Sequence, residues 1–125
     1  MAISKCDITI SIGELYDKYS ILLIKKEKIN DDNKLFYLNK EINLLTPLIV
    51  KFNLNDLVFE KLKKINEILW DVEDKIRIKE IKNDFDEEFI SLARLVYKTN
   101  DQRHIVKNEI DNIFNSEIKE IKSYV

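Results

Sequence analysis

Apolar residues recur every three to four positions along most of this chain, a spacing that places them on one face of an α-helix. The start differs, because "CDITIS" (6–11) alternates polar and apolar residues and predicts a short extended segment. Ser11 and Glu14 then fit a capping box, in which each side chain would accept a hydrogen bond from the other residue's amide. We therefore expect a first helix from about Ile12 to Ile29, ended by "NDDN".

A second apolar stripe predicts a helix from about Lys34 to Leu45. Proline lacks an amide hydrogen and disfavours helix at the residue before it, so Thr46–Pro47 should end or kink this helix. The following "LIVKFNLND" (48–56) is expected to be a short connector with at most one helical turn. The residues that share the apolar face are Leu35, Leu38, Ile42 and Leu45.

A third helix is expected from Asn55 or Asp56 to about Lys82. Its apolar residues step by three and four positions: Leu62, Ile65, Leu69, Val72 and Ile76. In "NDFDEEF" (83–89), Asp86 is a good N-cap, and the acidic residues after it suit the positive end of a new helix.

A fourth helix should begin near Glu87. Thr99 and Gln102 fit a capping box, which would split this segment into two helices. Against a break, the apolar residues stay in phase across Thr99, and the segment has no glycine or proline. We favour one continuous helix to about Lys122.

These elements predict an all-α fold, an antiparallel bundle of about four helices in a single domain (1–125). The third and fourth helices are long, and the hairpin that they form could pair with a second copy of the chain. Composition agrees, because the chain has one glycine, one proline, 35% charged residues and 45% hydrophobic residues. This balance is typical of helical bundles.

Net charge and cysteine content narrow the class of protein. The net charge of −2 gives no electrostatic footprint for nucleic acid or for an anionic membrane, so we expect neither as a direct partner. The single Cys6 excludes an internal disulfide and suggests a reducing compartment. No signal peptide and no membrane-spanning apolar run is evident, which favours a cytoplasmic location.

The expected fourth helix carries polar residues where its apolar stripe should continue. Asn100, Arg103 and Lys107 lie on the same face as Val96 and Ile110. Two cations four residues apart repel each other mildly unless an anion neutralises them. They could pair with carboxylates on a neighbouring helix, lie at a solvated edge of the bundle, or bind an anionic ligand.

The expected third helix offers such carboxylates. Glu73, Arg77 and Glu80 share one side of it, and Glu73 with Arg77 is a favourable i,i+4 pair. A salt-bridge network is the favoured interpretation. Asp74 beside these acids leaves a divalent cation site as the alternative.

Lys18 and Lys25 interrupt the apolar face of the first helix. Long lysine side chains often extend from an apolar face to water, and this is the favoured interpretation. If the bundle instead brings them beside Arg77 and Arg103, the cations would form a pocket for phosphate or carboxylate.

Other candidate chemistry has little support. Trp70 and Tyr97 are expected in the core rather than as ligand-stacking platforms. His104 has no histidine or cysteine at ligand spacing, so no zinc site is expected, and Cys6 has no base nearby in sequence. One glycine cannot build a phosphate-binding loop or a dinucleotide fingerprint.

Several ordered blocks resemble a family of short bacterial and phage or viral proteins defined only as a domain of unknown function. The blocks are "ISIGELYDKYSILLIKKEKI", "LWDVEDKIRIKE", "FISLARLVYKTNDQRHIVKNEI" and "SEIKEIKSY". The resemblance implies no particular reaction. It does associate such proteins with sugar-transfer proteins, and it covers the odd polar positions of the third and fourth helices.

We therefore expect a non-enzymatic helical binding module, capable of forming a homodimer, that holds a protein partner or a small anionic ligand such as a nucleotide or phosphosugar. No cofactor is expected. Arg77, Arg103 and Lys107 would hold the anion, Asn100 and Tyr97 would orient it, and Glu73 and Glu80 would position the arginines; Lys18 and Lys25 complete the candidate set. The alternatives are a metal-dependent enzyme, with Glu73, Asp74 and Glu80 on magnesium, and a purely structural interaction protein.

Overall fold

A computed structural model describes residues 4–123, in which the chain forms four α-helices and no strand. The all-α prediction is therefore confirmed. The helices are α1 (Ile12–Lys28), α2 (Asp32–Phe52), α3 (Asp56–Ile81) and α4 (Glu87–Ile113).

Polar N-caps begin α1, α3 and α4 where the sequence predicted them. The Ser11 hydroxyl accepts from the Glu14 amide at 3.0 Å, the Asn55 side chain from the Leu57 amide at 2.8 Å, and the Asp86 carboxylate from the Phe89 amide at 2.9 Å. These contacts satisfy amides that the first turn of a helix leaves without a partner. The predicted starts of α1, α3 and α4 are confirmed.

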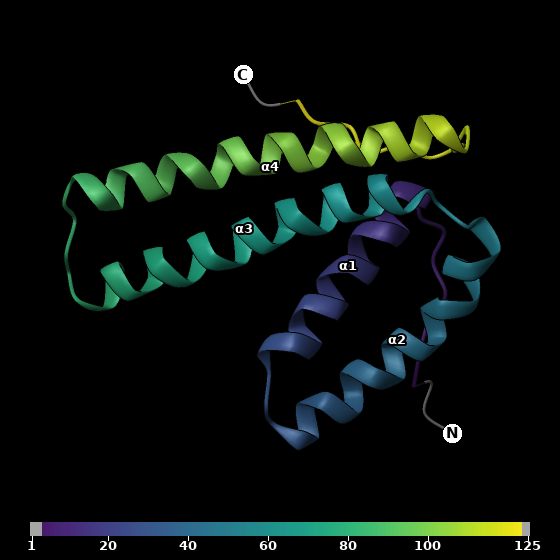
Figure 1. Cartoon of the computed structure of the whole chain (residues 1–125), viewed down its shortest axis with the longest axis horizontal. Helices are drawn as coiled ribbons and strands as arrows, with labels where there is room; N and C mark the ends of the chain where they lie inside the picture. The colour runs from purple at the N-terminus through teal and green to yellow at the C-terminus, as the bar shows by residue number, and fades with distance from the viewer. Residues whose placement is uncertain (1–3, 124–125) are drawn as a thin grey trace.

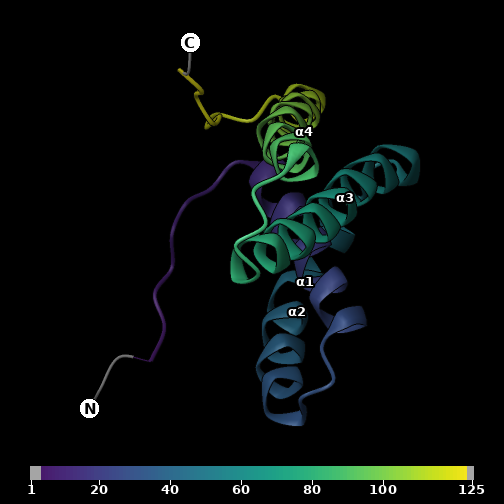
Figure 2. The ribbon, with the colours of Figure 1, turned by 90° about the vertical axis from the view of Figure 1, so that its left-hand side faces the viewer.

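The helices form two hairpins, and α1 joins them (Figure 1). Helices α3 and α4 run side by side as a long antiparallel hairpin. Helix α1 packs against α2, α3 and α4, whereas within the described chain the backbone of α2 comes close to α1 alone among the helices. Figure 2 shows the extended segment before α1 leading away from the helices.

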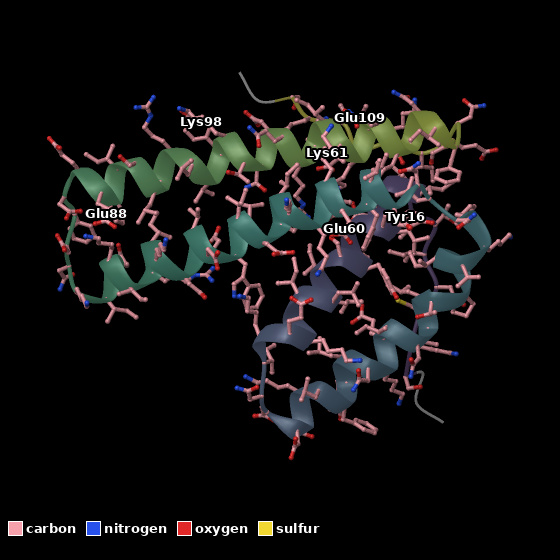
Figure 3. All side chains as sticks on the ribbon, viewed as in Figure 1. Tyr16, Glu60, Lys61, Glu88, Lys98 and Glu109 are labelled. Atoms are coloured by element: carbon pink, nitrogen blue, oxygen red, sulfur yellow. The ribbon has the colours of Figure 1, made fainter. Side chains whose placement is uncertain are left out.

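The hairpin of α3 and α4 extends beyond α1. In Figure 1, α1 meets only the half of this hairpin that holds the start of α3 and the end of α4. At that half, Lys61 of α3 and Glu109 of α4 lie across from each other (Figure 3), with Nζ 3.3 Å from Oε1. We call the other half, α3 from Leu69 and α4 up to Asn100, the arm.

The main apolar cluster lies where the loop before α3 meets α1 and α4. Tyr16, Leu62 and Ile110 are at most 2% exposed there. The Tyr16 hydroxyl donates to the Ile49 carbonyl at 3.0 Å and accepts from the Leu54 amide at 3.1 Å. Tyr16 therefore holds α1 to the end of α2 and to the start of the loop that follows it.

The prediction that Pro47 ends the second helix was wrong, because α2 continues through it to Phe52. Proline removes the hydrogen bond to the carbonyl of Asn43, but Asn43 is exposed, so water can solvate that carbonyl. Beyond the proline, Ile49 and Phe52 pack against the apolar cluster around Tyr16. Tertiary packing thus outweighs the local preference.

The fourth helix is continuous through Thr99, as favoured, but it ends at Ile113 and not near Lys122. Asn115 is left-handed with φ 51°, the Ser116 amide donates to the Asp111 carbonyl at 2.8 Å, and the Asn115 amide donates to the Asn112 carbonyl. This is a Schellman termination, in which a left-handed residue turns the chain back and satisfies the last carbonyls. The following residues then return along α4.

Candidate functional site

An ion pair between Asp17 of α1 and Arg103 of α4 lies inside the molecule. Asp17 is 0% exposed. The Arg103 Nε donates to Asp17 Oδ1 at 2.8 Å, and Nη2 donates to Oδ2 at 2.5 Å. This bidentate arrangement uses the rigid fork of the guanidinium and fixes its orientation.

Asn66 of α3 completes the same group. Its Nδ2 donates to Asp17 Oδ1 at 3.0 Å and to the Ser20 hydroxyl at 2.8 Å. The Ser20 hydroxyl in turn donates to the Asp17 backbone carbonyl at 2.7 Å. One buried carboxylate therefore receives hydrogen bonds from both helices of the hairpin.

Lys107, one turn beyond Arg103, is also buried, with 4% exposure. Its ammonium lies 2.6 Å from Glu14 Oε2 of α1 and 2.5 Å from Glu120 Oε2 in the segment after α4. The buried ammonium is thus covered by carboxylates from two directions. We call Glu14, Asp17, Asn66, Arg103, Lys107 and Glu120 the buried network.

The pKa shifts of Asp17, Arg103 and Glu120 favour their charged forms. Burial alone would raise the pKa of Asp17, but hydrogen bonds from Arg103 and Asn66 and the charges of Arg103 and Lys107 outweigh burial and lower it. The hydrogen bond with Asp17 raises the pKa of Arg103. The hydrogen bond from Lys107 likewise lowers the pKa of Glu120.

Gly13 allows α1 and α4 to approach this closely. Its amide donates to Asp111 Oδ1 at 2.6 Å. A Cβ atom at this position would overlap the backbone carbonyl of Lys107 and would lie 2.8 Å from Asp111 Oδ1. Glycine is required here because of close packing, since its φ angle is negative.

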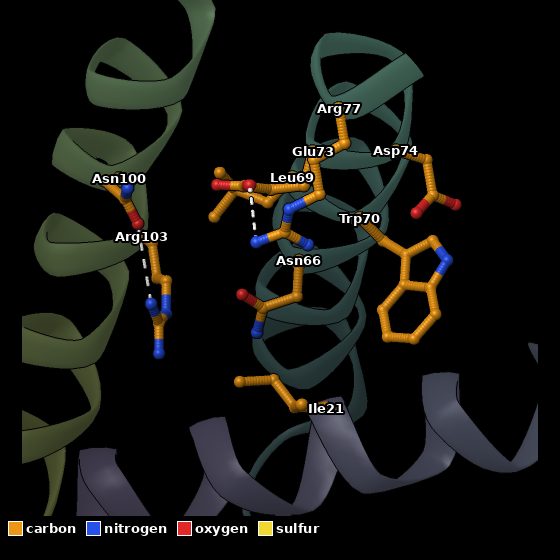
Figure 4. A pocket seen from close by; sticks show the side chains of 9 residues that line it. All are labelled: Ile21, Asn66, Leu69, Trp70, Glu73, Asp74, Arg77, Asn100 and Arg103. Atoms are coloured by element: carbon orange, nitrogen blue, oxygen red, sulfur yellow. Dashed lines mark hydrogen bonds and ion pairs between the residues drawn. The ribbon is translucent and has the colours of Figure 1, made fainter. Parts of the chain in front are cut away.

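A cleft of about 370 Å³ opens beside Arg103 where α1, α3 and α4 meet. Figure 4 shows Arg103 and Asn100 of α4 on one side, Asn66, Glu73 and Arg77 of α3 facing them, Trp70 and Asp74 on the far side of α3, and Ile21 of α1 at the base. The lining residues are Ile21, Asn66, Leu69, Trp70, Glu73, Asp74, Arg77, Asn100 and Arg103.

The cleft combines an aromatic surface with charged groups. Trp70, the one tryptophan of the chain, is half-buried in its wall. Arg77 is 72% exposed, and its Nη2 lies 3.3 Å from Glu73 Oε2. Arg103 Nη1, the nitrogen that does not bind Asp17, has Asn100 Oδ1 at 3.5 Å. Both guanidinium groups can therefore offer donors to a molecule in the cleft.

The predicted site residues divide into three sets. Arg103 and Lys107 belong to the buried network, and Glu73, Arg77, Asn100 and again Arg103 line the cleft. The others lie elsewhere on the described surface: Lys18, Lys25, Glu80 and Tyr97. The alternative in which the α1 lysines converge with the arginines is therefore not realised.

The partners of Arg103 and Lys107 also differ from those expected. The carboxylates come from α1 and from the segment after α4, and not from Glu73 and Glu80 of α3. Glu14 was assigned to a capping box, but its carboxylate binds Lys107, so only the Ser11 half of that box forms. The i,i+4 pair of Glu73 with Arg77 is confirmed.

Sequence reasoning missed Asp17, Asn66 and Glu120. A signal for Asp17 was present, because Gly13, Asp17 and Ser20 recur at helical spacing and define a small, polar stripe on α1. Such a stripe indicates a face on which another helix approaches closely. Glu120 gave no such signal, because it contacts Lys107 only after α4 has ended and the chain has turned back.

Neither a metal site nor a membrane-spanning helix is found among the described residues. Among residues 4–123, no group of three or more His, Cys, Asp or Glu side chains is placed to hold a metal ion. This gives no support to a magnesium site on Glu73, Asp74 and Glu80. In the same part of the chain, no helix is both long and apolar enough to cross a membrane.

These features define a class of protein: a small all-helical chain with a buried ionic network beside an open cleft. The chain belongs to the family of unknown function DUF6165, whose sequence model matches residues 6–125. This match confirms the resemblance to a family of unknown function. No curated protein and no solved structure matches the chain.

Proposed function

We propose that this protein is a non-enzymatic binding module whose cleft between α1, α3 and α4 receives a small ligand with a planar or apolar part and an anionic group. A nucleotide or a phosphosugar has this chemistry. The observation that carries the proposal is the position of Trp70 and Arg77 in the wall of a cleft of about 370 Å³. That volume lies within the range of about 300–1,000 Å³ found for small-molecule sites.

The charge balance supports Arg77 as the anion-binding group. The buried network contains two cations and three carboxylates, Glu14, Asp17 and Glu120, so its cations are already compensated. Arg77 has only the partly exposed Glu73 beside it, and exposed ion pairs of this kind contribute little stability. An anionic ligand can therefore replace Glu73 at low cost.

In this proposal the buried network positions a cleft wall, and Lys107 does not touch the ligand. Asp17 holds Arg103 through Nε and Nη2, which leaves Nη1 with only a long contact to Asn100 Oδ1. A side chain fixed in this way loses little conformational entropy when a ligand binds, which favours affinity.

A cytoplasmic location is part of the proposal. Cys6 is exposed and has no second cysteine in the chain to pair with. Such a thiol is most compatible with a reducing compartment.

A purely structural interaction protein is the second candidate. It is favoured by the filled bidentate pair of Asp17 and Arg103, because saturated ion pairs inside a protein fix geometry without any ligand. The two candidates differ in the role of Arg77, which only the binding module needs.

A thermal-shift experiment separates them. Purified protein is heated with AMP, UMP, UDP-glucose, glucose 1-phosphate or inorganic phosphate, and the same series is run on Arg77→Ala and on Arg94→Ala. Arg94 is an exposed arginine of α4 outside the cleft, so it is a matched control. A ligand at a hundredfold excess over its dissociation constant adds about 2.7 kcal/mol to the unfolding free energy.

The binding module predicts that at least one organic compound raises the melting temperature of the native protein and of Arg94→Ala, but not that of Arg77→Ala. A shift that survives in Arg77→Ala would place binding outside the cleft. The absence of any shift would favour the structural protein.

A further inference from the structure

The arm is a two-helix structure without a third helix over it. In Figure 1 nothing else of the described chain covers this half of the hairpin. The face that α1 covers on the other half continues along the arm, because Trp70, Arg77 and Ile81 follow one another by seven and four residues on α3. On α4, Ala93 and Tyr97 continue the face from Asn100. We call this surface the arm face.

The arm face exposes large apolar side chains. Ile81 is 81% exposed and Tyr97 is 54% exposed. Phe89, Ala93 and Val96 of α4 are only partly buried. Large apolar side chains exposed on one face of a helical hairpin are groups that an interface between two molecules can cover.

Charge on the arm face is self-complementary. Glu73 and Arg77 lie one turn apart on α3, with opposite charges. Two copies of α3 that cross antiparallel, with a two-fold axis between these positions, bring each Arg77 to Glu73 of the partner subunit. A two-fold interface requires this kind of reciprocal contact, in which residue i meets j and j meets i.

We infer that the arm faces of two copies pack against each other and form a homodimer whose centre is a four-helix bundle of two α3–α4 hairpins. The interface borders the cleft, because Trp70, Glu73 and Arg77 belong to both surfaces. In this dimer Glu73 of the partner subunit meets Arg77, so an anionic ligand that binds Arg77 in the cleft competes with that contact. The dimer itself goes beyond the proposed function, whereas this competition rests on it.

The test measures the molar mass of the full chain by sedimentation equilibrium, without ligand, for the native protein and four variants. Ile81→Glu and Tyr97→Glu place a charge on the arm face. Leu57→Glu and Ile105→Glu place the same charge at sites of matched exposure, 81% and 57%, outside that face. Circular dichroism verifies that each variant keeps its helices.

The inference predicts that the native protein is a dimer and that Leu57→Glu and Ile105→Glu remain dimers. In Ile81→Glu and Tyr97→Glu the dissociation constant of the dimer should rise at least tenfold. Arg77→Glu should weaken the dimer too, and Glu73→Arg in the same chain should restore it. A native monomer at 100-fold the concentrations used for ligand binding would overturn the dimer. So would a dimer that survives both arm-face variants.

The two proposals fail separately. A monomer that still gives an Arg77-dependent thermal shift would retain the binding module and remove the dimer. A dimer of the predicted kind that binds none of the compounds would retain the dimer and remove the ligand.

Discussion

Asp17 is the residue through which α1 holds both helices of the long hairpin. It is fully buried, it accepts from Arg103 and Asn66, and it lies 3.9 Å from the ammonium of Lys107. Burying this carboxylate is favourable only when all of its hydrogen-bond donors are present. Removing one partner leaves the others desolvated without compensation.

Asp17→Asn should therefore destabilise the protein strongly. Breaking a buried ion pair costs about 3–5 kcal/mol, and the lower end applies because the Arg103 side chain keeps 28% exposure. Urea unfolding followed by circular dichroism measures this loss. Asp71→Asn, at an exposed position of α3, is the control and should change the unfolding free energy by less than about 0.5 kcal/mol. Equal stability of the two variants would contradict the role given to Asp17.

The same carboxylate makes stability depend on pH. Because its folded pKa lies below the ordinary value of 3.8, Asp17 stabilises the folded state above that pH, and this contribution is lost as the pH falls through the folded pKa. The difference in unfolding free energy between native protein and Asp17→Asn should therefore shrink below about pH 4. Urea titrations between neutral and acidic pH measure the difference. A constant difference over that range would show that Asp17 titrates normally.

Gly13→Ala should destabilise the protein, although replacing a glycine in a helix by alanine usually stabilises it. Alanine normally stabilises a helix relative to glycine by about 0.5–1 kcal/mol. Here the added Cβ meets backbone and a bound carboxylate, neither of which can move freely, so we expect a net loss of about 1–3 kcal/mol. Urea unfolding would contradict this if the variant were as stable as the native protein.

Sequence reasoning recognised one side of this network and not the other. Arg103 and Lys107 are noticeable because cations interrupt an apolar stripe. Asp17 is less noticeable, because a carboxylate next to Lys18 on a charged helix is commonplace, and only the small, polar stripe with Gly13 and Ser20 marks its face. Its pairing with Arg103 depends on how α1 crosses α4, which no local pattern contains.

At the scale of elements, periodicity predicted where helices begin better than where they end. Helix starts carry side-chain caps that can be read directly, such as Ser11 and Asp86. The ends of α3 and α4 depend on Asn83 and Asn115, which adopt left-handed conformations. Asparagine is frequent in this chain, so its presence alone did not identify these two positions.

Pro47 gives a test at this scale. Because α2 passes through Pro47, the proline lies inside a helix, where it lowers the free energy of unfolding by about 3 kcal/mol. Proline also restricts the unfolded chain, which raises the free energy of unfolding by about 1 kcal/mol. Pro47→Ala should therefore stabilise the protein by about 2 kcal/mol. Thermal and urea unfolding measure this gain. A loss of stability would mean that the proline ring contributes packing that outweighs the missing hydrogen bond.

At the scale of the whole molecule, α1 determines where the cleft lies. It crosses one half of the long hairpin, and the cleft opens where it leaves Trp70 and Arg77 uncovered. The sequence predicted the polar residues of α3 and α4 but not their separation into a buried network and an open cleft. That separation depends on the angle between two hairpins.

The sole tryptophan makes the central claim directly measurable. Trp70 lines the cleft, so its fluorescence reports on a molecule that binds there. The measurement is a titration of tryptophan emission with AMP, UMP, UDP-glucose and glucose 1-phosphate, for the native protein, Arg77→Ala and Arg94→Ala. We predict a saturable change with at least one compound in the native protein and in Arg94→Ala, and at least a tenfold weaker affinity in Arg77→Ala. No change with any compound, in protein that circular dichroism shows to be folded, would contradict the assignment of the cleft as the binding site.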